Sequence, residues 1–259
     1  MPKLAALIVL ILALAGCAAP QAVPDFAAKP YVPFNREDAV AIALREWRLF
    51  GGLTDEPNSP EPLAPKPERA AGLWERVGEY WWIGIRGEGR EARWTGKHDE
   101  GGRIFPAADD ERYAWSAAFV SYVMRIAGAG DRFPYSPNHA GYINAAASGR
   151  SPLLRAHAPE GYAPKPGDLI CFGRDWASGV TVGDLPTRGY WPGHCAIVVA
   201  RRGPALDAVG GNDHDAVTMD HIATNPDGGL SSEDGALRWP IVIEVRYDAE
   251  TDPDPGAAR

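Results

Sequence analysis

Apolar side chains recur at three- and four-residue intervals in the first half of the chain and alternate with polar ones in the second half. The first pattern is typical of amphipathic helices and the second of half-buried strands. The helical intervals cover residues 37–50, 73–85, 116–127 and 139–147. The strand-like runs cover residues 168–172, 193–199, 205–209, 216–219 and 241–247. Because the helices precede the strands, the order predicts an α+β fold with N-terminal helices packed on an antiparallel sheet.

Changes in composition divide the chain into segments. We expect a signal peptide at 1–17, a proline-bearing tether at 18–35, a helical N-terminal extension at 36–109, a main domain at 110–247 and a loose acidic tail at 248–259. The connection over 173–193 is long for a compact domain, and such connections are usually functional. It carries Trp176 and Trp191, which we expect to form a lip over a groove.

The first 17 residues have the features of a secretory signal. Lys3 precedes an apolar run that is too short to span a bilayer, and small residues follow the run. The ending Leu14-Ala15-Gly16-Cys17 resembles the lipobox of bacterial lipoproteins, which implies cleavage before Cys17 and acylation of this cysteine. By resemblance to the sorting rule of bacteria with two membranes, the alanine that follows implies a lipid anchor in the outer membrane, facing the periplasm.

Net charge limits the classes of binding partner, and the cysteines allow a disulfide. The formal net charge of −8 argues against a nucleic-acid backbone as partner, but not against a cell-wall polymer or peptide. Cys171 and Cys195 are the cysteines of the mature body, and both lie in strand-like runs. In an exported protein they could pair, or they could be two small buried residues; their spacing does not decide between these alternatives.

Acidic and histidine side chains cluster towards the end of the chain, in Asp213, His214, Asp215, Asp220 and His221. Such a group could hold a metal ion, but polar side chains in a turn are more often simply solvated. The cysteines lack the CxxC spacing of structural zinc sites, and the zinc-peptidase and Walker motifs are not found in the sequence. We therefore expect neither a metal nor a cofactor.

Ser116 stands one turn before the apolar stripe of the central helix. A serine at a helix start commonly caps the helix or allows tight packing. Alternatively, its hydroxyl is a nucleophile that is buried on one side and open to a cleft on the other.

His194 opens a strand, and Asn212 follows a glycine pair at the far end of the next strand. If these strands form a hairpin, the Asn212 side chain lies beside the His194 ring and can orient it. A serine, a histidine and a polar orienting group are the components of a nucleophilic site. His139, at the start of the short helix, either lines a pocket or caps that helix.

Four segments of the chain resemble, in order and spacing, the NlpC/P60 and CHAP amidases, a papain-like superfamily of bacterial wall hydrolases. They are residues 113–124, which resemble the nucleophile helix, Gly167-Asp168-Leu169-Ile170, the strand beginning at His194, and Val209-Gly210-Gly211-Asn212. The resemblance covers roughly residues 110–247 and implies a papain-like fold. The helices before residue 110 have no counterpart in it.

The resemblance implies that the peptide part of peptidoglycan is the substrate. In this interpretation Ser116 attacks the amide bond, His194 acts as base and then as acid, and Asn212 orients the ring. Trp115, His139 and Asp168 shape the substrate site together with the two tryptophans of the 173–193 connection.

One departure from the family pattern concerns the nucleophile, because Ser116 stands where the family has cysteine. A thiol readily becomes a thiolate, whereas a serine needs a base to remove its proton during attack. The chain is therefore either a serine version of the amidase or an inactive binding or scaffolding lipoprotein that retains the groove. An esterase acting on small esters is a further alternative.

Overall fold

The structure is a computed structural model that describes residues 33–55, 66–230 and 239–248. The expected signal peptide, the expected acylation site Cys17, nearly all of the expected tether and nearly all of the expected tail lie outside these residues. Within the described residues, no helix combines the length and apolar character that crossing a bilayer requires.

The helices of the body begin and end close to the predicted positions. They are α3 (Arg36–Leu49), α4 (Leu73–Gly84), α5 (Ser116–Ile126) and α6 (His139–Ala147). Asparagines cap two of them: Asn35 accepts a hydrogen bond from the Asp38 amide at 2.7 Å, and Asn138 accepts one from the Gly141 amide at 3.2 Å. A 3-10 segment, Ala107–Tyr113, leads into α5 and carries acidic residues towards its N-terminal end, where the helix dipole favours them.

The strands form one mixed sheet of seven strands in the described residues, in the order β1-β6-β5-β4-β3-β7-β2. They are β1 (Leu53–Asp55), β2 (Leu154–His157), β3 (Leu169–Gly173), β4 (Gly193–Arg202), β5 (Ala205–Asp213), β6 (Ala216–Ala223) and β7 (Ile241–Val245). Every neighbouring pair is antiparallel except β1 and β6, which are parallel. The α+β class is therefore confirmed, and the expected all-antiparallel sheet is corrected at one edge by β1, a three-residue strand too short to leave a hydrophobic pattern.

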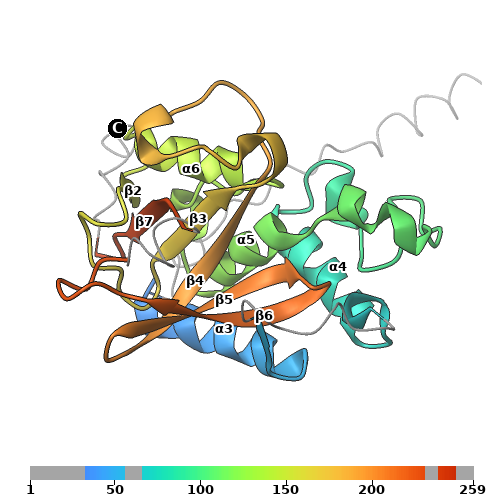
Figure 1. The fold of residues 1–259 in the computed structure, drawn as a ribbon. Helices are drawn as coiled ribbons and strands as arrows, with labels where there is room; N and C mark the ends of the chain where they lie inside the picture. The colour runs from blue at the N-terminus through green and yellow to red at the C-terminus, as the bar shows by residue number, and fades with distance from the viewer. Residues whose placement is uncertain (1–32, 56–65, 231–238, 249–259) are drawn as a thin grey trace, which may run out of the picture. The chain divides into compact units, whose positions relative to one another are not determined.

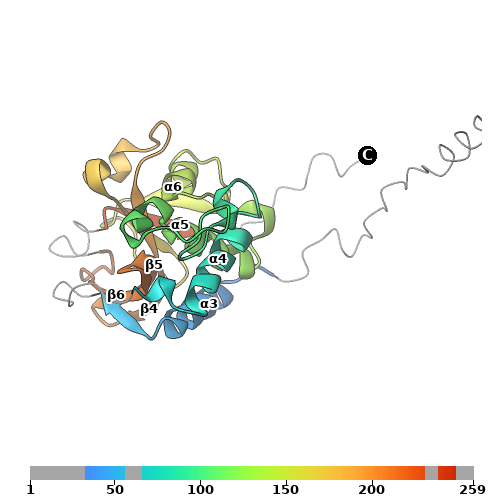
Figure 2. The same ribbon diagram turned by 90° about the vertical axis from the view of Figure 1, so that its right-hand side faces the viewer.

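Helices α3, α5 and α6 lie against the sheet, and α4 packs along α5 (Figures 1 and 2). The main core fills the space between these helices and one face of the sheet, to which Cys195 and Ile197 of β4 contribute. Their neighbours Ala196 and Val198 pack in a smaller cluster on the opposite face, around Trp239. Alternation along β4 thus assigns each residue to one face, and this assignment decides the composition of the functional site.

The two body cysteines form a disulfide between β3 and β4. Cys171 and Cys195 are opposite each other in the strand register, and both are fully buried on the helix-covered face. This pairing answers the question that the sequence left open. It fits a protein that folds in an oxidising compartment.

Candidate functional site

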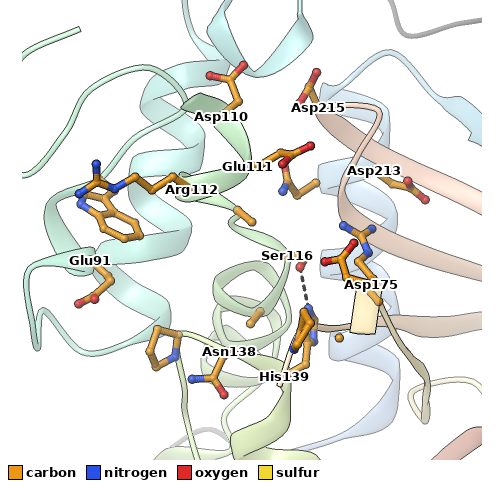
Figure 3. Close-up of a pocket in the computed structure, with 18 of the residues that line it drawn as sticks. Glu91, Asp110, Glu111, Arg112, Ser116, Asn138, His139, Asp175, Asp213 and Asp215 are labelled. Atoms are coloured by element: carbon orange, nitrogen blue, oxygen red, sulfur yellow. Dashed lines mark hydrogen bonds between the residues drawn. The ribbon is translucent and has the colours of Figure 1, made fainter. Parts of the chain in front are cut away.

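A cleft of about 800 Å³ opens where the starts of α5 and α6 meet the end of β5 and the 173–193 connection. The end of α4 and the Ala107–Tyr113 segment complete its wall. The cleft is within the size range of sites for small molecules and short peptides. Figure 3 shows Ser116 and His139 side by side, with Asp110 and Asp215 away from them at the other end of the lining.

Ser116 is the first residue of α5 and is only 5% exposed. Its hydroxyl does not cap the helix, because the N-cap residue is Trp115, which makes no side-chain capping bond. Instead, Ser116 Oγ lies 2.7 Å from His139 Nε2 (Figure 3). The structure therefore pairs the candidate nucleophile with a histidine, as a serine nucleophile requires.

This histidine is His139 rather than the predicted His194. His139 begins α6 and lines the cleft, whereas Asn138 provides the helix cap, so the structure decides between the two roles considered for His139. The other ring nitrogen of His139 contacts the hydroxyl of Tyr142, one turn further along α6. Tyr142 is fully buried, and His139 Nδ1 is the hydrogen-bond partner that its hydroxyl has among the described residues.

Burial lowers the pKa of His139 well below its usual value, and the positive charge of Arg174 lowers it further. Burial also raises the pKa of Tyr142 well above its usual value. At neutral pH the site therefore contains a neutral imidazole and a neutral phenol. A neutral imidazole can accept a proton from a serine, but only through a nitrogen that does not already carry one.

His194 lies beside this pair, but its contacts differ from the prediction. It shares the sheet face of Ala196, while α5 packs on the opposite face, so strand alternation directs it away from Ser116. Its ring centroid is 5.6 Å from that of His139, and Arg174 Nη2 lies 3.2 Å from His194 Nδ1. His194 is fully buried and acts as a supporting neighbour of the Ser116–His139 pair.

Asn212 lines the cleft at the end of β5, at a bulge against β6 where its φ is +58°. It is not the group that orients either histidine ring: those contacts come from Tyr142 and Arg174. The preceding glycines have separate steric roles. A Cβ at Gly210 would lie 2.8 Å from His194 Nε2, and one at Gly211 would lie 2.7 Å from Phe119 on α5.

The predicted aromatic residues are divided among the cleft, the surface and the core. Trp191 lines the cleft with only 2% of its surface exposed, whereas Trp176 is 74% exposed and lies outside the cleft lining. Trp115 is buried between Phe50 and Tyr80, and its indole N–H donates to Glu68 Oε2 at 2.5 Å. It supports the start of α5 from behind.

Asp168 is a structural residue, contrary to the prediction that it shapes the substrate site. Its fully buried carboxylate accepts hydrogen bonds from the amides of Lys165 and Val245 and from the hydroxyl of Tyr162. An ion pair with Arg36 at 3.3 Å connects it to α3. Asp168 thus joins the turn before β3 to β7 and to the first helix, because a buried carboxylate needs this many donors.

Two groups of acidic residues bring possible metal ligands together in the described part of the chain. In one, Glu68, Asp110 and Asp215 converge, but Lys66 forms ion pairs with both aspartates, at 2.7 and 3.1 Å. The lysine ammonium thus occupies the position that a cation would take. The other group consists of Asp55, Asp213 and His214. Asp220 and His221, also considered from the sequence, belong to neither group.

Tyr142 and Arg174 contact the site but were not among the residues predicted from the sequence. Tyr142 follows His139 at helical spacing, so the i,i+3 pattern of α6 was a signal for that contact. No sequence signal marked Arg174, because its approach to the two histidines depends on the path of the connection after β3.

The fold and the cleft define an α+β protein with a buried serine–histidine pair at the junction of two helix starts. The chain belongs to a family described as "Uncharacterized protein conserved in bacteria (DUF2272)", whose model matches residues 68–248. The match begins well before residue 110, so it includes α4 and the segments that form the cleft wall. Comparison with curated proteins and with solved structures yields no match.

Proposed function

We propose that this protein is a cell-wall hydrolase that cleaves an amide bond in the peptide part of peptidoglycan, with Ser116 as nucleophile and His139 as base. The observation that carries the proposal is the 2.7 Å contact between Ser116 Oγ and His139 Nε2 at the cleft. The resemblance of segments 113–124 and 209–212 to the NlpC/P60 and CHAP amidases supports the substrate class. The lipobox-like ending at Cys17 supports a lipid anchor in the outer membrane, facing the periplasm.

The chemistry of attack follows from the position of Ser116. When Oγ attacks the carbonyl carbon, its proton passes to Nε2 of His139, and the carbonyl oxygen becomes an oxyanion. The first-turn amides of α5 have no partner within the helix, and Ser116 and Ala117 both line the cleft. Their N–H groups are the donors available to the oxyanion. His139 then returns the proton to the leaving amine, and water releases the acyl group.

A second candidate function is peptide binding without turnover, and the contact between Tyr142 and His139 favours it. A buried phenol whose available acceptor is Nδ1 donates its proton there, because an unsatisfied buried donor costs about 1–3 kcal/mol. The imidazole proton then resides on Nε2 and is donated to Ser116. In this arrangement the serine hydroxyl donates into the cleft and is not activated.

Digestion of purified peptidoglycan by the full chain in detergent, read by mass spectrometry, tests both candidates. Wild type, Ser116→Ala, His139→Gln and Ser116→Cys are compared. The amidase proposal expects new peptide fragments from wild type that disappear with the alanine and glutamine variants. Fragments from the cysteine variant alone would indicate an intact groove with an inactive serine. Undigested material in every sample, together with unchanged wall binding by Ser116→Ala, would support the binding function.

A further inference from the structure

Arg174 brings a permanent positive charge to the cleft. It follows β3 directly, is half-buried and lines the same cleft as Ser116 and His139. Its Nη2 lies 3.2 Å from Nδ1 of His194, whose ring centroid is 5.6 Å from that of His139, so the positive charge is close to His139 and contributes to its lowered pKa. Among the residues that line the cleft, Arg174 is thus the cation near the serine–histidine pair.

The contacts of Arg174 leave most of its donors available. Its Nη2 lies 3.2 Å from His194 Nδ1, and its guanidinium lies 5.8 Å from the centre of the Phe172 ring. Neither neighbour supplies a negative charge. Within the described residues no carboxylate forms an ion pair with Arg174, although the adjacent Asp175 is an exposed part of the cleft lining.

An arginine in this setting is suited to an anionic ligand. Removing a guanidinium from water without a counter-ion is unfavourable, and its planar set of five N–H donors matches a carboxylate. The charge is permanent, so it favours a group that is already negative in the ground state. A peptide substrate offers such a group as a free carboxylate near the bond that is cleaved.

We propose that Arg174 binds a free carboxylate of the peptide ligand beside the Ser116–His139 pair, which makes it a specificity-determining residue. The inference rests on the proposed peptide substrate and deepens it: the ligand is an acidic peptide, with its carboxylate next to the reacting amide.

The test compares two forms of one ligand mixture. Muropeptides are released from purified peptidoglycan by a muramidase, and half of the sample has its carboxylates converted to methylamides. Binding of both forms to the full chain in detergent is measured by competition with one fluorescent native muropeptide. Wild type is compared with Arg174→Gln, Arg174→Lys and Arg188→Gln. Arg188 is an exposed arginine of the same connection that lies outside the cleft lining, so it is the matched control.

If Arg174 forms a charge-assisted hydrogen bond of ordinary strength with the ligand carboxylate, wild type is expected to bind the native form about 10- to 100-fold more tightly than the methylamide form. Arg174→Gln is expected to remove this preference, Arg174→Lys to keep part of it, and Arg188→Gln to keep all of it. Because the preference is a ratio within one protein, a general loss of folded material does not imitate the result.

Equal binding of the two forms by wild type, or a preference that survives in Arg174→Gln, would overturn the inference. Failure of the chain to bind either form would overturn it as well. Ser116→Ala separates the inference from the amidase proposal, since it is expected to abolish turnover while keeping the preference. A wild type that shows the preference but cleaves nothing would refute the amidase and leave the role of Arg174 standing.

Discussion

Replacing Tyr142 by Phe is the most informative single change in the site, because it removes one hydroxyl and keeps the ring. That hydroxyl contacts Nδ1 of His139, whose Nε2 contacts Ser116. Since a neutral imidazole carries one proton, donation by the phenol to Nδ1 places that proton on Nε2. If the site is catalytic as proposed, the imidazole must then exchange tautomers before His139 can accept the proton of Ser116.

The size of this effect follows from burial. Tyr142 is fully buried, and an unsatisfied buried donor costs about 1–3 kcal/mol. At 1.4 kcal/mol per factor of ten, the tautomer that can act as base is disfavoured by roughly 10- to 100-fold. Tyr142→Phe removes this preference and leaves about half of the molecules in the active tautomer, so we expect the rate of muropeptide hydrolysis to rise by roughly 5- to 50-fold.

Two measurements check the prediction. Nitrogen NMR of histidine-labelled protein is expected to show the proton of His139 on Nε2 in wild type and a mixture of tautomers in Tyr142→Phe. Hydrolysis rates are measured in parallel, with thermal unfolding to correct for the roughly 1 kcal/mol of stability that a lost hydrogen bond removes.

The reasoning fails if wild-type His139 carries its proton on Nδ1. It also fails if Tyr142→Phe loses as much activity as His139→Gln. Either result would mean that the phenol accepts a hydrogen bond and orients the ring for catalysis.

Three further predictions concern stability. Because the pKa of His139 is lowered in the folded state, the unfolded chain binds a proton at mildly acidic pH that the folded chain does not. The free energy of unfolding of wild type, measured in urea, is therefore expected to fall as pH drops below about 6.5, more steeply than that of His139→Gln. Equal dependence of the two free energies on pH would contradict this. Burial, with the charges of nearby aspartates, raises the pKa of Glu68 to about 8, so the folded state binds a proton that the unfolded state has lost. The free energy of unfolding is therefore expected to fall as pH rises from about 4.5 to 8, by at most about 1.4 kcal/mol per pH unit. Glu68→Gln should flatten that fall, and an unchanged pH profile would argue against a protonated Glu68. Glu46 is fully buried on α3 and accepts hydrogen bonds from Arg76 at 2.6 Å and from Tyr80 at 2.8 Å. Glu46→Ala is expected to lower the free energy of unfolding in urea by about 3–5 kcal/mol, because it leaves the arginine buried without its partner. A loss below about 1 kcal/mol would show that the network adds little to stability.

Much of the fold was predictable because its elements are long and periodic. The helix over 139–147 was predicted with the bounds observed, and the others came within a few residues. Strands β1 and β2 were missed, since they have three and four residues and leave no clear alternation. The pairing of Cys171 with Cys195 was open in the sequence, and only the register of β3 against β4 brought them together.

In the candidate site, too, some features could be predicted from the sequence and others depend on the tertiary structure. The sequence by itself determined the helix and strand pattern and the placement of Ser116 at a helix start, because these depend on neighbours within a few residues. It also marked His139 and Asn212, which line the cleft with Ser116. Which histidine meets the serine was decided only by the tertiary structure. Strand alternation turns His194 away from α5, while the start of α6 brings His139 to 2.7 Å from the hydroxyl. That choice, like the approach of Arg174, depends on how distant segments pack, and no local pattern encodes it.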